Sequence, residues 1–104
     1  MIKRTDKNQQ IIMDTFRKLG YKVKDCSAVG KGFPDLIISK TGENLLVECK
    51  TETGRLTIDQ LKFISEWNSA VYICLDADDC VSLDKGMLPP VTLTNEQNKK
   101  LLGI

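Results

Sequence analysis

The pattern of hydrophobic and polar positions predicts helices and strands in alternation along the chain. Ile12 and Phe16 recur at helical spacing, and Gly20 follows as the kind of residue found just past a helix end. Thr5 or Asp6 is expected to cap this first helix. The expected elements, in order, are this helix to about Leu19, strands over 21–27, 33–39 and 44–51, a helix capped by Thr57 and running to about Asn68, and a strand over 70–75.

This order predicts an α/β domain with a mixed central sheet flanked by helices. The first three strands are expected to form an antiparallel meander. The fourth should run parallel to a neighbour because a helix precedes it. Residues 76–79 are expected to form a polar loop or turn, and a short last helix is expected from Thr94 or Asn95 to about Leu102. By its length the whole chain, residues 1–104, is predicted to be a single domain.

Three charged residues interrupt two of the apolar strands. Asp35 lies in the second strand, and Glu48 and Lys50 lie in the third. If the two strands form a hairpin about Thr41-Gly42, Asp35 faces Glu48, and Lys50 points the same way as Glu48 because side chains alternate. A one-residue bulge in the turn would instead make the two carboxylates diagonal neighbours.

Two opposed carboxylates in a sheet repel each other unless a cation lies between them. Their hard oxygen atoms suit Mg²⁺ or Mn²⁺, and Lys50 adds a cation where a phosphate oxygen or an attacking water would lie. This is the equipment for metal-assisted attack on a phosphodiester. The alternative is a structural ion-pair network, in which Lys50 neutralises Asp35 or Glu48.

Composition narrows the chemistry further. The chain has no histidine, which excludes Ser-His-Asp triads, Cys-His pairs and histidine-bound metals. Its four cysteines form no CxxC pair and are expected to be free buried thiols. The first residues lack the apolar region of a signal peptide, and no apolar run reaches the length of a membrane span, so a cytoplasmic protein is expected.

Charge is unevenly distributed, with most basic residues before the first motif and most acidic residues after Lys50. A basic half is compatible with a polyanionic partner, and equally with ordinary solvated helix charge. Lys3, Arg4, Lys7, Lys31 and Arg55 are the residues expected to contact the phosphates of such a partner. Phe63 and Trp67 lie on an apolar helix face, which favours core packing or a dimer contact over base stacking.

The residues around these charges resemble a known family. Pro34-Asp35 followed by Glu48-Cys49-Lys50 matches the PD-(D/E)xK nuclease motif. Together with Gly32, Gly54-Arg55-Leu56-Thr57 and Gln60, the motif resembles the VRR-NUC family, from the first helix to the strand at 71–75. The resemblance implies a restriction-endonuclease-like αβββαβ core and a Mg²⁺- or Mn²⁺-dependent nuclease.

The resemblance also implies roles by position. Asp35 and Glu48 would bind the metal together with the main-chain carbonyl of Cys49, Lys50 would orient or activate the water, and Gln60 would support the site. Many relatives carry a first-helix glutamate that reaches the metal. Here the candidates to replace it are Asp6, Gln9 and Gln10.

Small stand-alone members of the family, often from phages, resemble Holliday-junction resolvases in being dimers. The expectation is therefore a homodimer that cleaves branched DNA, since two symmetric sites can cut two strands. Two other hypotheses are a nonspecific, flap or fork nuclease with the same chemistry, and a non-catalytic DNA-binding or assembly module that keeps the fold.

Overall fold

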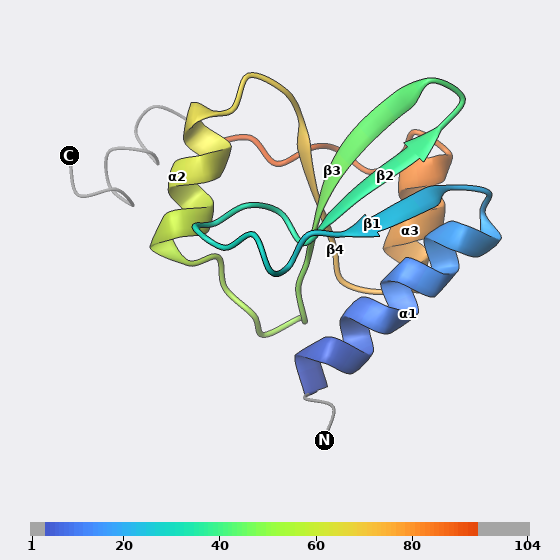
Figure 1. The fold of residues 1–104 in the computed structure, drawn as a ribbon, viewed down its shortest axis with the longest axis horizontal. Helices are drawn as coiled ribbons and strands as arrows, with labels where there is room; N and C mark the ends of the chain where they lie inside the picture. Colours follow the sequence, from blue (N-terminus) through green and yellow to red (C-terminus); the bar gives the residue numbers. More distant parts are fainter. Residues whose placement is uncertain (1–3, 94–104) are drawn as a thin grey trace.

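The computed structural model describes residues 4–93, and the side chains from residue 7 onward. The elements are α1 (Arg4–Lys18), β1 (Lys22–Asp25), β2 (Leu36–Lys40), β3 (Glu43–Cys49), α2 (Ile58–Glu66), β4 (Val71–Cys74) and α3 (Ala77–Asp84). The predicted α-β-β-β-α-β order is therefore confirmed, and a further short helix follows it. Helices lie on both sides of the central strands (Figure 1).

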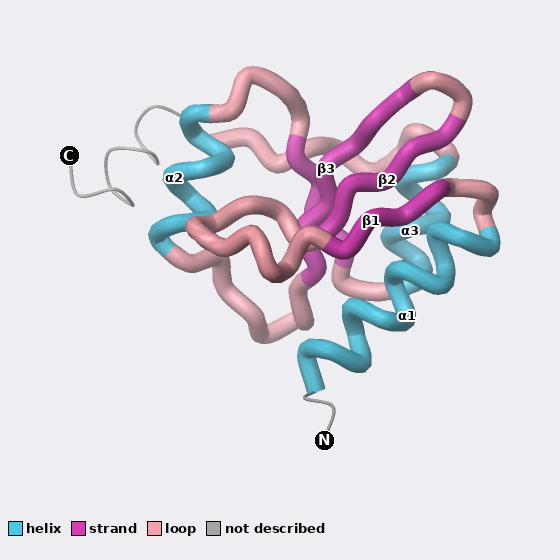
Figure 2. Tube along the Cα trace, in the orientation of Figure 1, coloured by secondary structure: helices cyan, strands magenta, loops and turns pink. Residues whose placement is uncertain are grey.

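The four strands form one mixed sheet in the order β1-β2-β3-β4 (Figure 2). The first three strands are antiparallel, and β4 pairs with β3 in parallel. The hairpin register is the predicted one: Lys40 pairs with Glu43, and Leu36 pairs with Val47. Both turn residues have positive φ, 50° at Thr41 and 84° at Gly42, as a tight two-residue hairpin turn requires. The register therefore contains no bulge.

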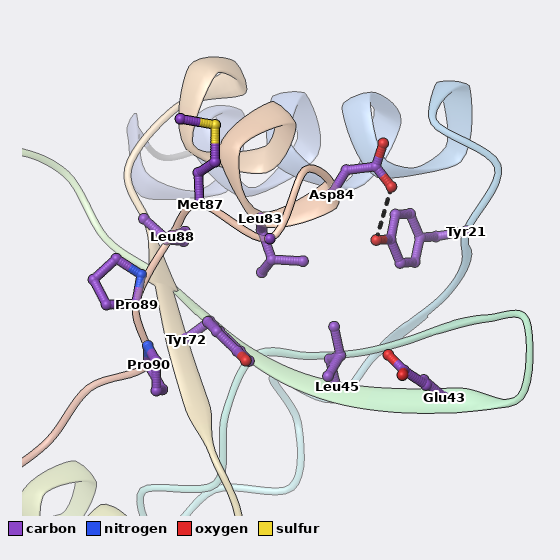
Figure 3. A pocket seen from close by; sticks show the side chains of 11 residues that line it. Tyr21, Glu43, Leu45, Tyr72, Leu83, Asp84, Met87, Leu88, Pro89 and Pro90 are labelled. Carbon is purple, nitrogen blue, oxygen red and sulfur yellow. Dashed lines mark hydrogen bonds between the residues drawn. The ribbon is translucent and has the colours of Figure 1, made fainter.

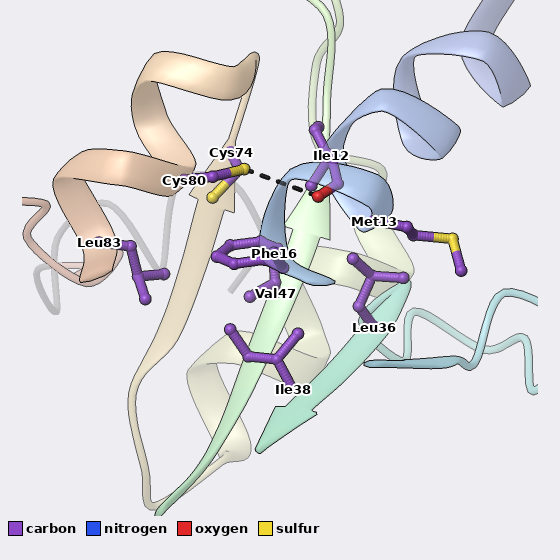
Figure 4. Close-up of a cluster of buried hydrophobic side chains, with 9 residues drawn as sticks. All are labelled: Ile12, Met13, Phe16, Leu36, Ile38, Val47, Cys74, Cys80 and Leu83. Atoms are coloured by element: carbon purple, nitrogen blue, oxygen red, sulfur yellow. Dashed lines mark hydrogen bonds between the residues drawn. The ribbon is translucent and has the colours of Figure 1, made fainter. Parts of the chain in front are cut away.

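The hydrophobic core lies on the sheet face that α1 and α3 cover. Side chains of both helices meet those of the sheet there (Figure 4): Ile12, Met13 and Phe16 from α1, Cys80 and Leu83 from α3, and Leu36, Ile38, Val47 and Cys74 from the strands. Since side chains alternate along a strand, burying Leu36 and Val47 on this face turns their neighbours Asp35 and Glu48 to the other face. All four cysteines are free thiols, three of them buried and Cys49 partly so.

Helix α2 lies apart from α1 and α3, on the other side of the strands in Figure 1. Aromatic contacts link it to the loop that precedes β2. The Phe33 ring meets the Phe63 ring edge to face at 5.3 Å, and Phe63 stacks on Trp67 at 4.8 Å. Trp67 remains 45% exposed, so this cluster lies outside the main core.

The prediction of a polar loop over residues 76–79 is wrong, because α3 begins at Ala77. Asp76 is its N-cap and accepts from the Asp79 N–H at 2.9 Å, while Asp79 accepts from the Leu75 N–H at 2.8 Å. The Asp76 cap turns a run of acidic residues into a helix start. The strands before it are also shorter than expected, as β2 begins at Leu36 and β3 ends at Cys49. The last helix expected between Thr94 and Leu102 lies outside the described residues.

Candidate functional site

The two carboxylates of the motif meet where β2 begins and β3 ends. Glu48 is 2% exposed, the one charged residue with that degree of burial among those the structure describes. The side chain of Asp35 accepts a hydrogen bond from the Cys49 N–H at 3.0 Å. The paired part of the hairpin ends at Leu36 and Val47, and a continuation of that register would place Asp35 opposite Glu48 and Pro34 opposite Cys49. Since proline has no amide hydrogen, it cannot donate to the Cys49 carbonyl.

Gln60, in the first turn of α2, lies in contact with Glu48. Its side-chain Nε2 donates to Glu48 Oε1 at 3.2 Å. The other end of the same amide is fixed, because Oε1 accepts the Thr57 N–H at 2.8 Å and Thr57 Oγ1 in turn accepts the Gln60 N–H at 3.2 Å. This capping box leaves only the NH₂ end of Gln60 to face Glu48. The same Gln60 side chain thus caps helix α2 through its Oε1 and contacts the Glu48 carboxylate through its Nε2.

The glycine before the motif allows α2 to come close to the carboxylates. Gly32 has φ of 81°, and a Cβ at this position would overlap the main-chain carbonyl of Asp59. The loop leading to Asp35 therefore packs backbone to backbone against the first turn of α2. Only glycine permits both the conformation and the close approach.

Replacing Gly32 with alanine is expected to lower the free energy of unfolding by more than about 2 kcal/mol, since strain at positive φ and overpacking add. Gly30→Ala is the matched control. Gly30 has φ of 76° but nothing within 4 Å of an added Cβ, so it should show only the backbone cost of about 1–2 kcal/mol. Urea unfolding of the two variants measures the difference. Equal losses would show that the loop does not depend on this close approach.

Burial and the neighbouring carboxylate make Glu48 hard to ionise. Desolvation, followed by the hydrogen bond and charge of Asp35, raises the pKa of Glu48 to about 9, while Lys50 acts in the opposite direction. Without a cation, the pair therefore holds a proton at neutral pH. A divalent ion between the carboxylates would replace that proton.

Lys50 follows the last residue of β3 and is held by its main chain. Its N–H donates to the Cys74 carbonyl at 3.1 Å, and its carbonyl accepts from the Asn8 side chain at 2.8 Å. Within the described part of the chain, Lys50 forms no ion pair with Asp35 or Glu48. This finding argues against the alternative of a structural ion-pair network.

The predicted residues line one open pocket of about 300 Å³. Its walls come from α1, the loop after β1, the residue before β2, the end of β3 with the loop that follows it, and the start of α2: Asn8, Gln9, Ser27, Asp35, Glu48, Cys49, Lys50, Thr51, Gly54 and Gln60. Asp35, Glu48, Lys50 and Gln60 are thus brought together as the sequence predicted.

The first helix contributes a residue that the sequence interpretation missed. Of the candidates to replace a glutamate, Gln9 lines the pocket, whereas Gln10 bonds Asp14 at 2.9 Å on the exposed face. The side chain of Asp6 lies outside those described. Asn8 also lines the pocket, and it is four residues before the buried Ile12. That spacing places Asn8 on the helix face toward the sheet. The same spacing is the sequence signal from which Asn8 could have been predicted as a site residue.

The basic residues expected to contact DNA are not gathered at the site. Lys7, Lys31 and Arg55 are exposed, and none of them lines the pocket of the carboxylates. Lys7 borders a neighbouring pocket with Thr51. Lys3 lies outside the described residues, as does the side chain of Arg4.

The donor set fits a hard divalent cation. Two facing carboxylates and a main-chain carbonyl supply only oxygen atoms, as Mg²⁺ and Mn²⁺ prefer. One carboxylate is buried with a single amide donor, which leaves acceptor capacity for a metal ion. Within residues 7–93 no three acidic, thiol or imidazole side chains form a metal cluster, so the remaining ligands would be main-chain oxygen and water.

Another pocket, of about 490 Å³, is lined by none of the residues of the carboxylate pocket. Figure 3 shows its lining. There the Tyr21 hydroxyl donates to Asp84 at 3.0 Å, and Lys40 pairs with the same carboxylate at 3.0 Å. Burial and the Asp84 carboxylate raise the pKa of Tyr21 to about 12. The contacts tie the hairpin to the end of α3, which indicates a structural role.

The mixed sheet flanked by helices, in αβββαβ order, places the protein in the restriction-endonuclease-like fold class. The model of the VRR-NUC domain matches residues 7–78, which is more than half of the chain. The chain therefore belongs to the VRR-NUC family, and its domain is of the nuclease type. Comparisons with curated proteins and with solved structures found no match. In residues 4–93 no helix combines the length and apolar character needed to cross a bilayer.

Proposed function

We propose that this protein is a metal-dependent endonuclease that hydrolyses phosphodiester bonds in branched DNA. The observation that carries the proposal is that Asp35 and the buried Glu48 line one pocket with Lys50, in a chain of the VRR-NUC family. Burying a carboxylate beside another carboxylate destabilises the fold unless the site binds a cation. Buried, neighbouring carboxylates of this kind are therefore expected mainly at functional sites, where a bound ligand compensates for their destabilising effect.

Each residue of the pocket has a role in this proposal. Asp35, Glu48 and the Cys49 carbonyl would hold Mg²⁺ or Mn²⁺, and the bound ion would supply charge neutralisation at the phosphate and a more acidic water. Asp35 is oriented by the Cys49 N–H and Glu48 by Gln60. Lys50 presents its ammonium to the phosphate oxygens or to the attacking water. Exposed Lys7, Lys31 and Arg55, with Lys3 and Arg4, contact flanking phosphates and make binding salt-dependent.

The proposed assembly is a homodimer. One pocket of about 300 Å³ accommodates one scissile phosphate, so a single chain cuts a single strand. A two-fold dimer places two such sites against two strands, as resolution of a four-way junction requires. The half-exposed Trp67 and the 65%-exposed Ile58, both at α2, offer apolar surface for such a contact.

Cleavage assays with a four-way junction, a flap, a duplex and a single strand, each with Mg²⁺ or Mn²⁺, test the substrate class. The expected result is preferential, symmetric cutting of the junction by a protein that light scattering shows to be a dimer. Equal cutting of all four substrates would favour a nonspecific nuclease, and preference for the flap would favour a fork nuclease. DNA binding with no cutting under any condition would favour the non-catalytic assembly module.

A further inference from the structure

Asn8 forms a long-range contact that the proposed mechanism does not use. Its side-chain Nδ2 donates to the main-chain carbonyl of Lys50 at 2.8 Å, joining residues 42 positions apart. Both residues line the pocket of the carboxylates. The contact therefore links the first helix directly to the motif strand.

The main chain at Lys50 depends on few contacts. Strand β3 ends at Cys49, and the chain turns away over 51–54, where the Gly54 N–H donates to the Thr51 carbonyl at 3.0 Å. The sheet still holds the Lys50 N–H through the Cys74 carbonyl at 3.1 Å. Asn8 holds the other side of the residue, at its carbonyl. Two hydrogen bonds thus fix the backbone from which the ammonium extends.

We infer that Asn8 is a positioning residue of the nuclease site, which holds the main chain of Lys50 so that its ammonium faces the pocket. The inference rests on the proposed function, because the positioned ammonium matters only if the site cuts DNA. Asn8 is suited to this task since its amide donates to a neutral carbonyl without adding charge. Helix α1 thus positions the motif lysine, Lys50, through a hydrogen bond to its main-chain carbonyl.

Asn8→Ala and Asn8→Asp test the inference together. Aspartate is nearly isosteric with asparagine but has no donor at neutral pH, so both variants should lose the hydrogen bond. The expected result for each is a fall in kcat of about 10- to 100-fold, as for other residues that orient a ligand or catalytic group. KM for DNA and the Mn²⁺ dissociation constant from calorimetry should change by less than about threefold, because the metal-binding carboxylates are untouched.

Gln10→Ala is the matched control, since it removes a neighbouring amide of the same helix that bonds only the exposed Asp14. It should leave cleavage unchanged. Wild-type kcat in both Asn8 variants would overturn the inference. So would an effect confined to KM, or tighter Mn²⁺ binding by Asn8→Asp, since the latter would make position 8 a place for a metal ligand.

A nuclear magnetic resonance measurement separates this inference from the proposed function. The Lys50 carbonyl and the Thr51 N–H belong to one peptide group, so loss of the Asn8 hydrogen bond should shift the Thr51 amide resonance in both Asn8 variants and not in Gln10→Ala. An unchanged resonance would overturn the inference even if the protein cuts DNA. If the wild-type protein cut no substrate, the proposed function would fail, and a shifted resonance would still establish that Asn8 holds Lys50.

Discussion

Asp35→Asn is expected to abolish Mg²⁺- or Mn²⁺-dependent cleavage, with a loss of at least about a thousandfold, because several kcal/mol of charge stabilisation depend on the metal. The fold should survive. The asparagine Oδ1 can still accept the Cys49 N–H, which lies 3.0 Å from the Asp35 carboxylate. Removing the charge of Asp35 also removes its unfavourable effect on ionisation of the buried Glu48. Cleavage rates with saturating metal ion, alongside circular dichroism and DNA binding, measure the effect.

Asp14→Asn is the control for this substitution. Asp14 lies on the exposed side of α1, where it pairs with Arg17 at 3.3 Å and accepts from Gln10. It has no contact with the pocket, so its removal should leave cleavage unchanged. An Asp35→Asn protein that is folded, binds DNA and cuts at the wild-type rate would refute the assignment of the site.

Glu48→Gln is expected to stabilise the metal-free protein while removing its activity. The pKa of Glu48 is raised from an ordinary value of 4.5 to about 9 in the folded protein, mainly by desolvation. The folded state therefore binds the proton more tightly than the unfolded state. Below pH 4.5 the group has little effect on relative stability, and between pH 4.5 and 9 the wild-type protein loses up to about 1.4 kcal/mol per pH unit. At pH 7 the glutamine variant should be more stable by about 3 kcal/mol.

Urea unfolding of both proteins between pH 4.5 and 9, in the presence of a chelator, measures this difference. It should grow with pH for Glu48→Gln, while Glu66→Gln, whose side chain is exposed at the end of α2, is the control and should change stability little. Adding Mn²⁺ should stabilise the wild-type protein and not Glu48→Gln, because metal binding requires the ionised carboxylate. A pH-independent difference would show that Glu48 is ionised in the free protein.

Both predictions follow from one compromise between the stability of the metal-free fold and the proposed metal binding. The site keeps an acidic residue at 2% exposure beside a second carboxylate, which lowers stability near neutral pH. Active sites commonly store such unfavourable electrostatics, and a bound ligand compensates for it. Here the compensating ligand in the proposed mechanism is the metal ion.

The local sequence determined the parts of this protein that depend on periodicity and short-range turns. The Thr41-Gly42 turn fixes the hairpin register, and continuing that register predicts Asp35, Glu48 and Lys50 on one side, where they line one pocket. The motif and its surrounding glycines identified the family. Gln60 came from the resemblance alone, since a polar residue three positions after the Thr57 cap is also typical of an ordinary exposed helix start. The acidic run before α3 was misread because a cap and a polar loop have similar composition.

Tertiary structure decided what lies between segments distant in the chain. Asn8 meets Lys50 across 42 residues, and Gly32 meets the first turn of α2. Neither contact follows from local spacing, because each depends on how helices pack on the sheet. The raised pKa of Glu48 has the same origin, since burial arises from the whole fold and not from neighbours in sequence. The sequence by itself thus determined which groups come to one side of the hairpin, and packing decided how each is held and how readily Glu48 ionises.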